Sequence, residues 1–430
     1  MHNRSMARGI HVLFLSAHGG MGADAAVHVS LARTLDRNQV RVSAATSAHE
    51  PPGASAREAF ERIPDLTLLP LELGRTFGEQ HGLGKAVTML HNLHGMANLV
   101  TLARWCREND VDVIHVTERP RQALFGLLLA RLSGCACVVQ AHTSFYPHDA
   151  TRLANWRLHQ ADAVVGVSHF TANTYLRLAN LAPDRVFAVH NAVDGVVFRP
   201  EPTHRAAMRQ RLGVPADAPV IGCVARLMRW KGQGTLLEAF VLVRKTIPSA
   251  QLVLAGLSAD SSPDGDGTYR DYLVRRIGAL GLEECVKLPG FLPQSDMPSF
   301  YSALDVVAHP SIEEPFGLAV VEAMACLRPV VAIGGGGILE IIRDEENGLL
   351  VPAEQPEAMA NAITRLFGNP AFAQHLAISA RQHVLERFTP AIQAAAMLKV
   401  YQEVVDRRGS AHRLHRDDAQ PHRHRYAPLQ

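Results

Sequence analysis

Short apolar runs alternate with longer amphipathic segments along most of the chain. The first run, residues 10–17, ends near a pair of glycines, and a stretch with helical spacing follows it. Short apolar runs bounded by turn residues are typical of buried parallel strands, and the amphipathic segments indicate helices that cover the sheet. The further predicted strands read VRVSAA, LTLLPL, VDVIHV, CVVQAH, DAVVGVS and RVFAVH, then VIGCVA, QLVLAG, CVKLPG, DVVAHP, PVVAIG and GLLVP.

The alternation breaks near residue 198, where the proline-rich polar segment FRPEPTH indicates a linker. Strand–helix units on both sides of this linker predict an α/β fold with two doubly wound domains, whose ligands bind at the carboxyl ends of the strands. The predicted helices span 84–108, 121–133, 233–246, 268–280, 318–326, 356–368 and 370–387. The predicted domains are residues 1–198 and 199–389, followed by a terminal helix at 390–406 and a disordered Arg- and His-rich tail at 407–430.

The composition is that of an ordinary globular protein, with 47% hydrophobic and 20% charged residues among 430. A formal net charge of only +2 gives no reason to expect a nucleic-acid partner. The six cysteines form no Cys-x-x-Cys pair, so buried reduced thiols are predicted. The sequence shows neither a signal peptide nor a bilayer-spanning run, which predicts a cytoplasmic protein. The basic tail leaves peripheral contact with the inner membrane face as an alternative.

The segment EEPFGLAVVE carries the strongest candidate chemistry. It follows the predicted strand DVVAHP and starts a helix, so the backbone amides of Phe316, Gly317 and Leu318 lie at a helix N-terminus that can bind a phosphate. Glu314 and Glu322 flank these amides, and carboxylates suit hydroxyl-rich sugars on both sides of a diphosphate. A helix whose positive end is capped by acidic residues is the alternative interpretation.

Two cations form the second candidate group. Arg226 and Lys231 lie in the loop between the strand VIGCVA and the next helix, where they could neutralise a diphosphate that departs with developing charge. A solvated loop with two unrelated cations is the alternative.

The first half offers two weaker candidates. Gly19 and Gly20, in GGMG after the first strand, could bind the same diphosphate through their amides, although glycine turns connect many strand–helix units. His142, at the end of the strand CVVQAH, could face the same cleft, or it could be a structural histidine. GGMG lacks the G-x-G-x-x-G spacing, which disfavours a dinucleotide oxidoreductase, and no histidine spacing indicates a metal site.

These motifs together resemble the glycosyltransferase group 1 family of retaining nucleotide-sugar transferases, which have the GT-B fold of two Rossmann-like domains facing across a cleft. The resemblance covers residues 10–406, and its carriers are ARLMRWKG, HNAVDGVVFRP, GGGGILEIIRDEENGLLVP and SIEEPFGLAVVEAMA, the last with the Glu-x7-Glu signature. The chain departs from the family pattern at Ala225, Leu339 and the pair Leu327-Arg328.

The resemblance implies a role for each candidate residue. It assigns the donor diphosphate to Arg226 and Lys231, the hydroxyls of the transferred sugar to Glu314 and the ribose to Glu322. It assigns the distal phosphate or the sugar to the amides of Phe316, Gly317 and Leu318, and it brings His142, Gly19 and Gly20 from the other domain. The first domain would bind the acceptor and the second the donor, and no metal or other cofactor would be required.

The expected activity is therefore transfer of a sugar from a nucleoside diphosphate sugar to an acceptor hydroxyl with retained configuration, of the hexosyltransferase type. The expected setting is cell-surface polysaccharide or glycoconjugate biosynthesis, with a glycan, a lipid-linked or a small-molecule acceptor. The alternatives are a nucleotide-sugar epimerase of the same fold and a non-catalytic protein that binds nucleotide sugars.

Overall fold

The computed structural model describes residues 9–16, 23–47, 55–71, 83–258 and 260–417. The chain divides into two compact units. The first comprises Met1–Val165, Tyr175–Phe187 and Ala394–Gln430, and the second comprises Gly166–Thr174 and Ala188–Gln393. The chain therefore passes between the units several times rather than once near residue 198, and the predicted domain limits remain a prediction.

The first unit is built on a sheet with the strand order β3-β2-β1-β4-β5-β6-β7. Strand β1 pairs in parallel with both β2 and β4, which is the doubly wound arrangement expected from the sequence. All positions of β1, β4 and β5 are buried, because helices cover both faces of a parallel sheet. The strands are β1 Ile10–Ser16, β2 Val40–Thr46, β3 Thr67–Pro70, β4 Val113–Thr117, β5 Ala136–Ala141, β6 Ala163–Gly166 and β7 Val186–Ala188.

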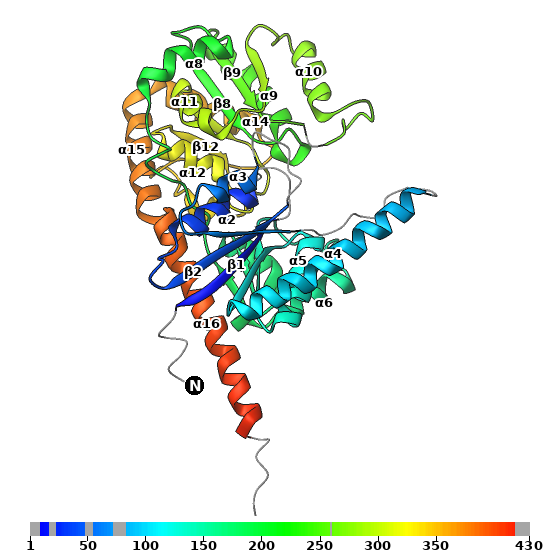
Figure 1. Cartoon of the computed structure of the whole chain (residues 1–430). Coiled ribbons are helices and arrows are strands. Elements are labelled where there is room, and N and C mark those ends of the chain that lie inside the picture. Colours follow the sequence, from blue (N-terminus) through cyan, green and yellow to red (C-terminus); the bar gives the residue numbers. More distant parts are fainter. Residues whose placement is uncertain (1–8, 17–22, 48–54, 72–82, 259, 418–430) are drawn as a thin grey trace, which may run out of the picture. The chain divides into compact units, whose positions relative to one another are not determined.

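Helices follow the strands of this sheet in the chain, as the blue to green part of Figure 1 shows. Two residues set the limits of α5. Pro120 occupies the first helical position, and Gly134, which directly follows the last helical residue, has a left-handed backbone conformation. The helices are α2 Ala23–Thr34, α3 Ala56–Glu61, α4 Leu83–Glu108, α5 Pro120–Ser133, α6 Arg152–Gln160 and α7 His169–Leu178.

The second unit has a parallel sheet with the strand order β10-β9-β8-β11-β12-β13. Alternate residues of its strands point to opposite faces: Val307 packs into one hydrophobic cluster, and its neighbours Val306 and Ala308 pack into the other. The strands are β8 Val220–Val224, β9 Gln251–Ala255, β10 Val286–Gly290, β11 Val306–His309, β12 Val330–Ile333 and β13 Leu349–Val351.

Helices cover both faces of this second sheet (Figure 1). The helices are α8 Arg205–Leu212, α9 Gln233–Thr246, α10 Tyr269–Ala279, α11 Met297–Ala303, α12 Leu318–Ala325, α13 Ile338–Ile341, α14 Pro356–Gly368 and α15 Pro370–Arg387. The last helix, α16 Pro390–Asp417, belongs to the first unit from Ala394 on. The predicted two-domain α/β fold class is thereby confirmed. Among the described residues, no helix is both long enough and apolar enough to cross a membrane.

One prediction about the C-terminal region is wrong. Residues 407–417 were expected to be disordered, but α16 continues to Asp417. Arg408 anchors the start of this extension, because its guanidinium bonds Asp162 Oδ1 at 2.7 Å and the carbonyl oxygens of Gly134 and Cys135 at 2.9 and 2.5 Å. These contacts lie within the first unit and cannot be read from local periodicity. Residues 418–430 lie outside the described part of the chain.

Candidate active site

Three neighbouring strands of the second sheet bring the main candidate residues to one edge. Strands β8, β11 and β12 are adjacent and parallel, so their carboxyl ends meet at the same edge. The loop after β8 carries Lys231, the loop after β11 carries Glu314, and the loop after β12 carries the glycines at 334–337. Glu314 pairs with Gly336 in an isolated parallel bridge, and Gly337 N donates to Glu314 O at 2.7 Å.

The central contact of the site joins Lys231 and Glu314. Lys231 Nζ lies 2.5 Å from Glu314 Oε2, and the two side chains are only 10% and 12% exposed. His309 Nε2 lies 3.1 Å from the same carboxylate oxygen. Burial alone would raise the pKa of Glu314, but the hydrogen bond from His309 and the ammonium of Lys231 outweigh it and hold the pKa at about 2. Glu314 is therefore ionised at neutral pH.

A tight turn places the Lys231 side chain. Gly232 has φ 72°, and a Cβ there would lie 2.0 Å from the carbonyl oxygen of Pro310, so only glycine fits. Ile312 N donates to Trp230 O at 3.0 Å, which joins the loop after β8 to the loop after β11. Lys231 Nζ also lies 3.9 Å from the centroid of the Trp230 ring. The ammonium is thus held by a carboxylate and an aromatic face.

Glu322 lies one turn into α12 and has different partners from Glu314. Tyr301 Oη donates to Glu322 Oε2 at 2.8 Å, and Gln294 Nε2 donates to Oε1 at 3.2 Å. Burial raises the pKa of Glu322 to about 7, because the two neutral hydrogen-bond donors only partly offset the lost hydration. The two glutamates of the signature thus differ in protonation near neutral pH, which their identical residue type could not reveal.

The start of α12 has the geometry expected of a phosphate-binding turn. Gly317 precedes the helix with φ 113°, and no side chain in the described part of the chain caps the helix there. This φ is one that residues with a side chain rarely adopt, which explains why glycine stands there. Phe316 is buried, and the first amides of α12, from Leu318 on, project from the helix end as at any helix N-terminus.

Arg226 is placed less firmly than Lys231. Its residue is exposed, and among the described residues no ion pair involves its side chain. Its backbone carbonyl accepts a hydrogen bond from Gln233 Nε2 at 2.9 Å, which fixes the loop but not the guanidinium. The structure therefore brings Lys231, Glu314 and the start of α12 together, and Arg226 lies exposed in the same loop as Lys231.

His142 belongs to the first unit. Its two ring nitrogens are buried, and neither has a hydrogen-bond partner in the described part of the structure. Burial lowers the pKa of His142, although the nearby carboxylates of Glu118 and Asp24 oppose this, so the imidazole is neutral at pH 7. Asp24 is itself bound by Arg119 Nε at 2.8 Å. Gly19 and Gly20 lie outside the described residues.

Sequence reasoning singled out Lys231 but missed the other partners of the two glutamates, which are His309, Tyr301 and Gln294. His309 is the last residue of β11 in an otherwise apolar strand, and a polar residue at the carboxyl end of a buried strand is a signal that could have found it. Tyr301 lies in α11 and Gln294 just before it, and nothing local marks either of them as a neighbour of Glu322.

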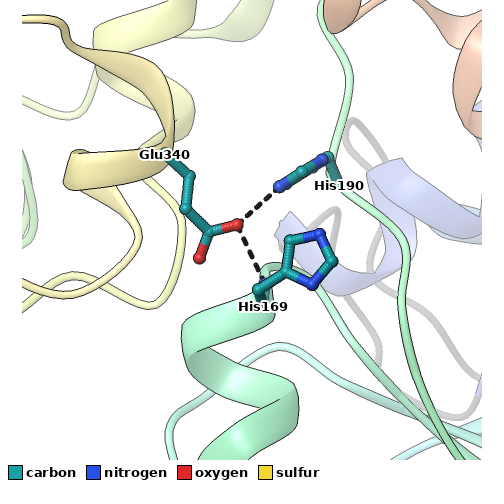
Figure 2. Close-up of side chains that lie close together, drawn as sticks. All are labelled: His169, His190 and Glu340. Carbon is teal, nitrogen blue, oxygen red and sulfur yellow. Dashed lines mark hydrogen bonds and ion pairs between the residues drawn. The ribbon is translucent and has the colours of Figure 1, made fainter.

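One group of side chains in the described residues has the composition of a metal site: His169, His190 and Glu340, shown in Figure 2. Glu340 Oε2 already accepts from His190 Nε2 at 2.6 Å and from His169 N at 2.9 Å, and Oε1 accepts from Phe170 N at 2.7 Å. A cation here would displace His190 and face the positive end of α7. The carboxylate is therefore better explained as a helix cap and ion-pair partner than as a metal ligand.

Comparison with known proteins gives two family matches. The model of glycosyl transferases group 1 matches residues 204–383, and the model of Glycosyltransferase Family 4 matches residues 25–195. The first match contains Lys231, Glu314 and Glu322, and the second contains His142.

Individual relatives support the same grouping. The alpha-maltose-1-phosphate synthase of Mycolicibacterium smegmatis is 31% identical over 375 residues, which cover 82% of this chain and 89% of that protein. The D-inositol 3-phosphate glycosyltransferase of Saccharomonospora viridis is 36% identical over 250 residues, which cover 57% of this chain and 56% of that protein. The chain therefore spans little more than half the length of this second relative.

A solved structure agrees on the fold. HepE of Anabaena, in complex with UDP and glucose, matches with a TM-score of 0.74 at 24% identity and covers 91% of this chain and 99% of that chain. The predicted pair of Rossmann-like domains is thus also the architecture of this solved protein.

Proposed function

Because the chain belongs to the group 1 family of glycosyltransferases, we propose that it transfers a sugar from a nucleoside diphosphate sugar to an acceptor hydroxyl with retained configuration. The observation that carries this proposal is the buried contact between Lys231 and Glu314 beside the N-terminus of α12. A cation, a carboxylate and helix amides at one sheet edge suit a diphosphate joined to a sugar.

In this proposal the diphosphate binds between Lys231 and the amides that start α12. Its negative charge competes with Glu314 for the ammonium, so the carboxylate becomes available for hydroxyls of the transferred sugar. Positive charge near the departing diphosphate stabilises the transition state more than the ground state, which is the condition for catalysis. Arg226, exposed in the same loop, adds a second cation once the diphosphate is present.

Glu322 is proposed to bind the ribose of the nucleotide. The carboxylate form accepts hydrogen bonds from two vicinal hydroxyls, whereas the protonated form offers fewer acceptor sites. A pKa of about 7 means that both forms are present at neutral pH, and a bound ribose favours the ionised one.

The first unit is proposed to bind the acceptor and to contribute His142. Its imidazole is neutral, so it can accept a hydrogen bond at one nitrogen and donate one at the other, as a sugar hydroxyl requires. Its two unpartnered, buried ring nitrogens support this role, because buried polar atoms are rarely left unsatisfied. Gly19 and Gly20 are proposed to complete the donor site from the same unit.

The acceptor and the wider setting are proposed only as broad classes. The relatives named above act on different molecules, so the acceptor is proposed only as a hydroxyl of a glycan, a lipid-linked glycan or a small molecule, in polysaccharide or glycoconjugate biosynthesis. HepE was solved with UDP and glucose, and UDP is therefore the first nucleotide to test.

A thermal-shift screen with UDP, GDP and ADP sugars tests the proposal first. A ligand raises the apparent stability by RT ln(1 + [L]/Kd), so the true donor gives the largest shift. Incubation of that donor with candidate acceptors is followed by NMR of the anomeric proton. A glycoside with the donor's configuration supports the proposal, a free epimerised nucleotide sugar indicates an epimerase, and binding without turnover under all conditions indicates a binding protein.

A further inference from the structure

The backbone carbonyl of Pro315, between Glu314 and Phe316, has an unusual pair of partners. Ser168 Oγ lies 2.5 Å from this oxygen, and Thr171 Oγ1 lies 3.0 Å from it. Both hydroxyl-bearing residues are fully buried. A buried carbonyl needs only one hydrogen bond to avoid most of its desolvation cost, so two side-chain donors from outside its own loop fix its direction as well.

The two donors come from a short segment with a special place in the chain. Gly166–Thr174 belongs to the second unit, although the residues just before and just after it in the sequence belong to the first. The segment packs closely: a Cβ on Gly166 would lie 2.3 Å from Ala172 N. Val189 N, where the chain returns to the second unit, donates to Gly166 O at 2.9 Å. Two crossing segments of the chain are thus joined to each other.

Glu340 contacts the same two segments. Its carboxylate accepts the amides of His169 and Phe170 in the first segment and pairs with His190 in the second, as Figure 2 shows for the histidines. Burial would raise the pKa of Glu340, but these three donors outweigh it and hold the pKa below its ordinary value. Glu340 follows the glycine loop whose Gly337 N donates to Glu314 O.

We propose that Thr171, Ser168 and Glu340 are positioning residues of the donor site, which hold the Glu314–Phe316 turn on the two crossing segments of the chain. Rotation of the Pro315 peptide would move both the Glu314 carboxylate and the amides that begin α12. This inference rests on the proposed function, because it concerns how the sugar-binding carboxylate is aimed. The acceptor and the donor base do not enter it.

Thr171→Val is the most informative variant. The contacts of the Ser168 and Thr171 hydroxyls with Pro315 O are called the clamp below. Ser168 also caps α7, because Thr171 N donates to Ser168 Oγ at 2.9 Å. Ser168→Ala would therefore weaken the helix as well as the clamp. Thr171→Val keeps the shape and the capping amide and removes only the hydroxyl. Thr174→Val is the matched control, because the Thr174 hydroxyl donates to Thr171 O at 2.7 Å, within its own helix.

The kinetic test compares these two variants with wild type and with Thr171→Ser, which restores the hydroxyl. We expect Thr171→Val to lower kcat about tenfold, with donor KM changed less than about threefold, since misplacement of a reacting group costs mainly turnover. Thr174→Val and Thr171→Ser should stay within about threefold of wild type. Equal kcat in Thr171→Val and Thr174→Val would overturn the inference, as would failure of Thr171→Ser to restore turnover.

Hydrogen exchange separates this inference from the proposed function. If wild type shows no transfer with any donor, the proposed function fails while the clamp can still be measured in the unliganded full chain. The amides of residues 316–320 should then exchange at least about tenfold faster in Thr171→Val than in Thr174→Val, because the turn opens more readily. Equal exchange in the two variants contradicts the positioning role.

Discussion

Lys231 Nζ and Glu314 Oε2 lie 2.5 Å apart, although 83 positions separate the two residues in the chain. Each is the counter-ion of the other in a nearly buried setting, and His309 shares the carboxylate. The residues that are proposed to bind the diphosphate and the transferred sugar of the donor thus form one electrostatic unit. Substitution of either one changes the environment of the other.

The first prediction concerns Lys231→Met, which keeps the unbranched stem of the side chain but removes its charged end. It leaves Glu314 buried without its cation, so the free energy of unfolding should fall by about 3–5 kcal/mol. Urea unfolding at pH 7.5 measures this. The double variant Lys231→Met/Glu314→Gln should regain much of the stability, and its turnover should stay at least about a hundredfold below wild type. Wild-type turnover in either variant would refute the assignment of Lys231.

The second prediction contrasts the two glutamates of the signature. Glu314→Gln should lower kcat about a hundredfold, because the carboxylate stabilises the sugar as positive charge grows on it. Glu322→Gln should mainly raise donor KM, by an amount equivalent to about 1.5–3 kcal/mol, because the ribose does not change during the reaction. Initial rates at pH 8, where Glu322 is ionised, separate the two effects.

Binding of the free nucleoside diphosphate provides the control for this contrast. It keeps the ribose and lacks the sugar, so calorimetry should show weaker binding in Glu322→Gln and nearly unchanged binding in Glu314→Gln. If both variants lose the same affinity, the acidic pair has no division of roles.

The third prediction concerns pH and Glu322. Its folded pKa of about 7 lies above the ordinary value of 4.5, so the folded state retains a proton between these pH values that the unfolded state has lost. The contribution of Glu322 to stability is therefore full below about pH 4.5 and decreases as the pH rises to about 7. The stability difference between wild type and Glu322→Gln should shift in favour of the variant over this range, as measured by urea unfolding.

Donor binding should show the opposite trend with pH. Donor kcat/KM of the wild type should rise through about pH 7 as Glu322 ionises, and Glu322→Gln should lack this rise. A rise of equal size in the variant would assign the titration to another group.

The fourth prediction is that turnover does not depend on a divalent metal. Lys231 and helix amides are proposed to neutralise the leaving diphosphate, and the carboxylate of Glu340 in the His169, His190 and Glu340 group is already bonded. Activity should stay within about twofold after treatment with EDTA and desalting. Loss of activity that Mg²⁺ or Mn²⁺ restores would contradict this mechanism.

The fifth prediction concerns the extended helix α16. Arg408→Ala removes the hydrogen bonds to Asp162 and to two backbone carbonyls, so the free energy of unfolding should fall by about 1–2 kcal/mol, a value reduced for partial exposure of the side chain. Lys399→Ala, an exposed position on the same helix, should change it by less than about 0.5 kcal/mol. Equal effects would show that Arg408 does not anchor the helix.

The sequence by itself determined the strands, the order in which they occur and most of the longer helices, but not short helices such as α8 and α11. Helices at 233–246, 356–368 and 370–387 match α9, α14 and α15 residue for residue, because local apolar spacing and flanking turn residues set their limits. Glu314 and Glu322 could also be singled out from sequence, since their spacing and the glycine between them are local features.

Only the tertiary structure decided how these residues act together. The contact of Lys231 with Glu314, the position of His309 on the same oxygen and the clamp of Ser168 and Thr171 on Pro315 all join distant parts of the chain or separate loops. The different pKa values of Glu314 and Glu322 arise from burial and from the different hydrogen-bond partners of the two carboxylates. Neither can be predicted from local periodicity. Arg408 shows the same rule in α16, because bonds to residues more than 200 positions away hold a segment whose own sequence indicates no helix.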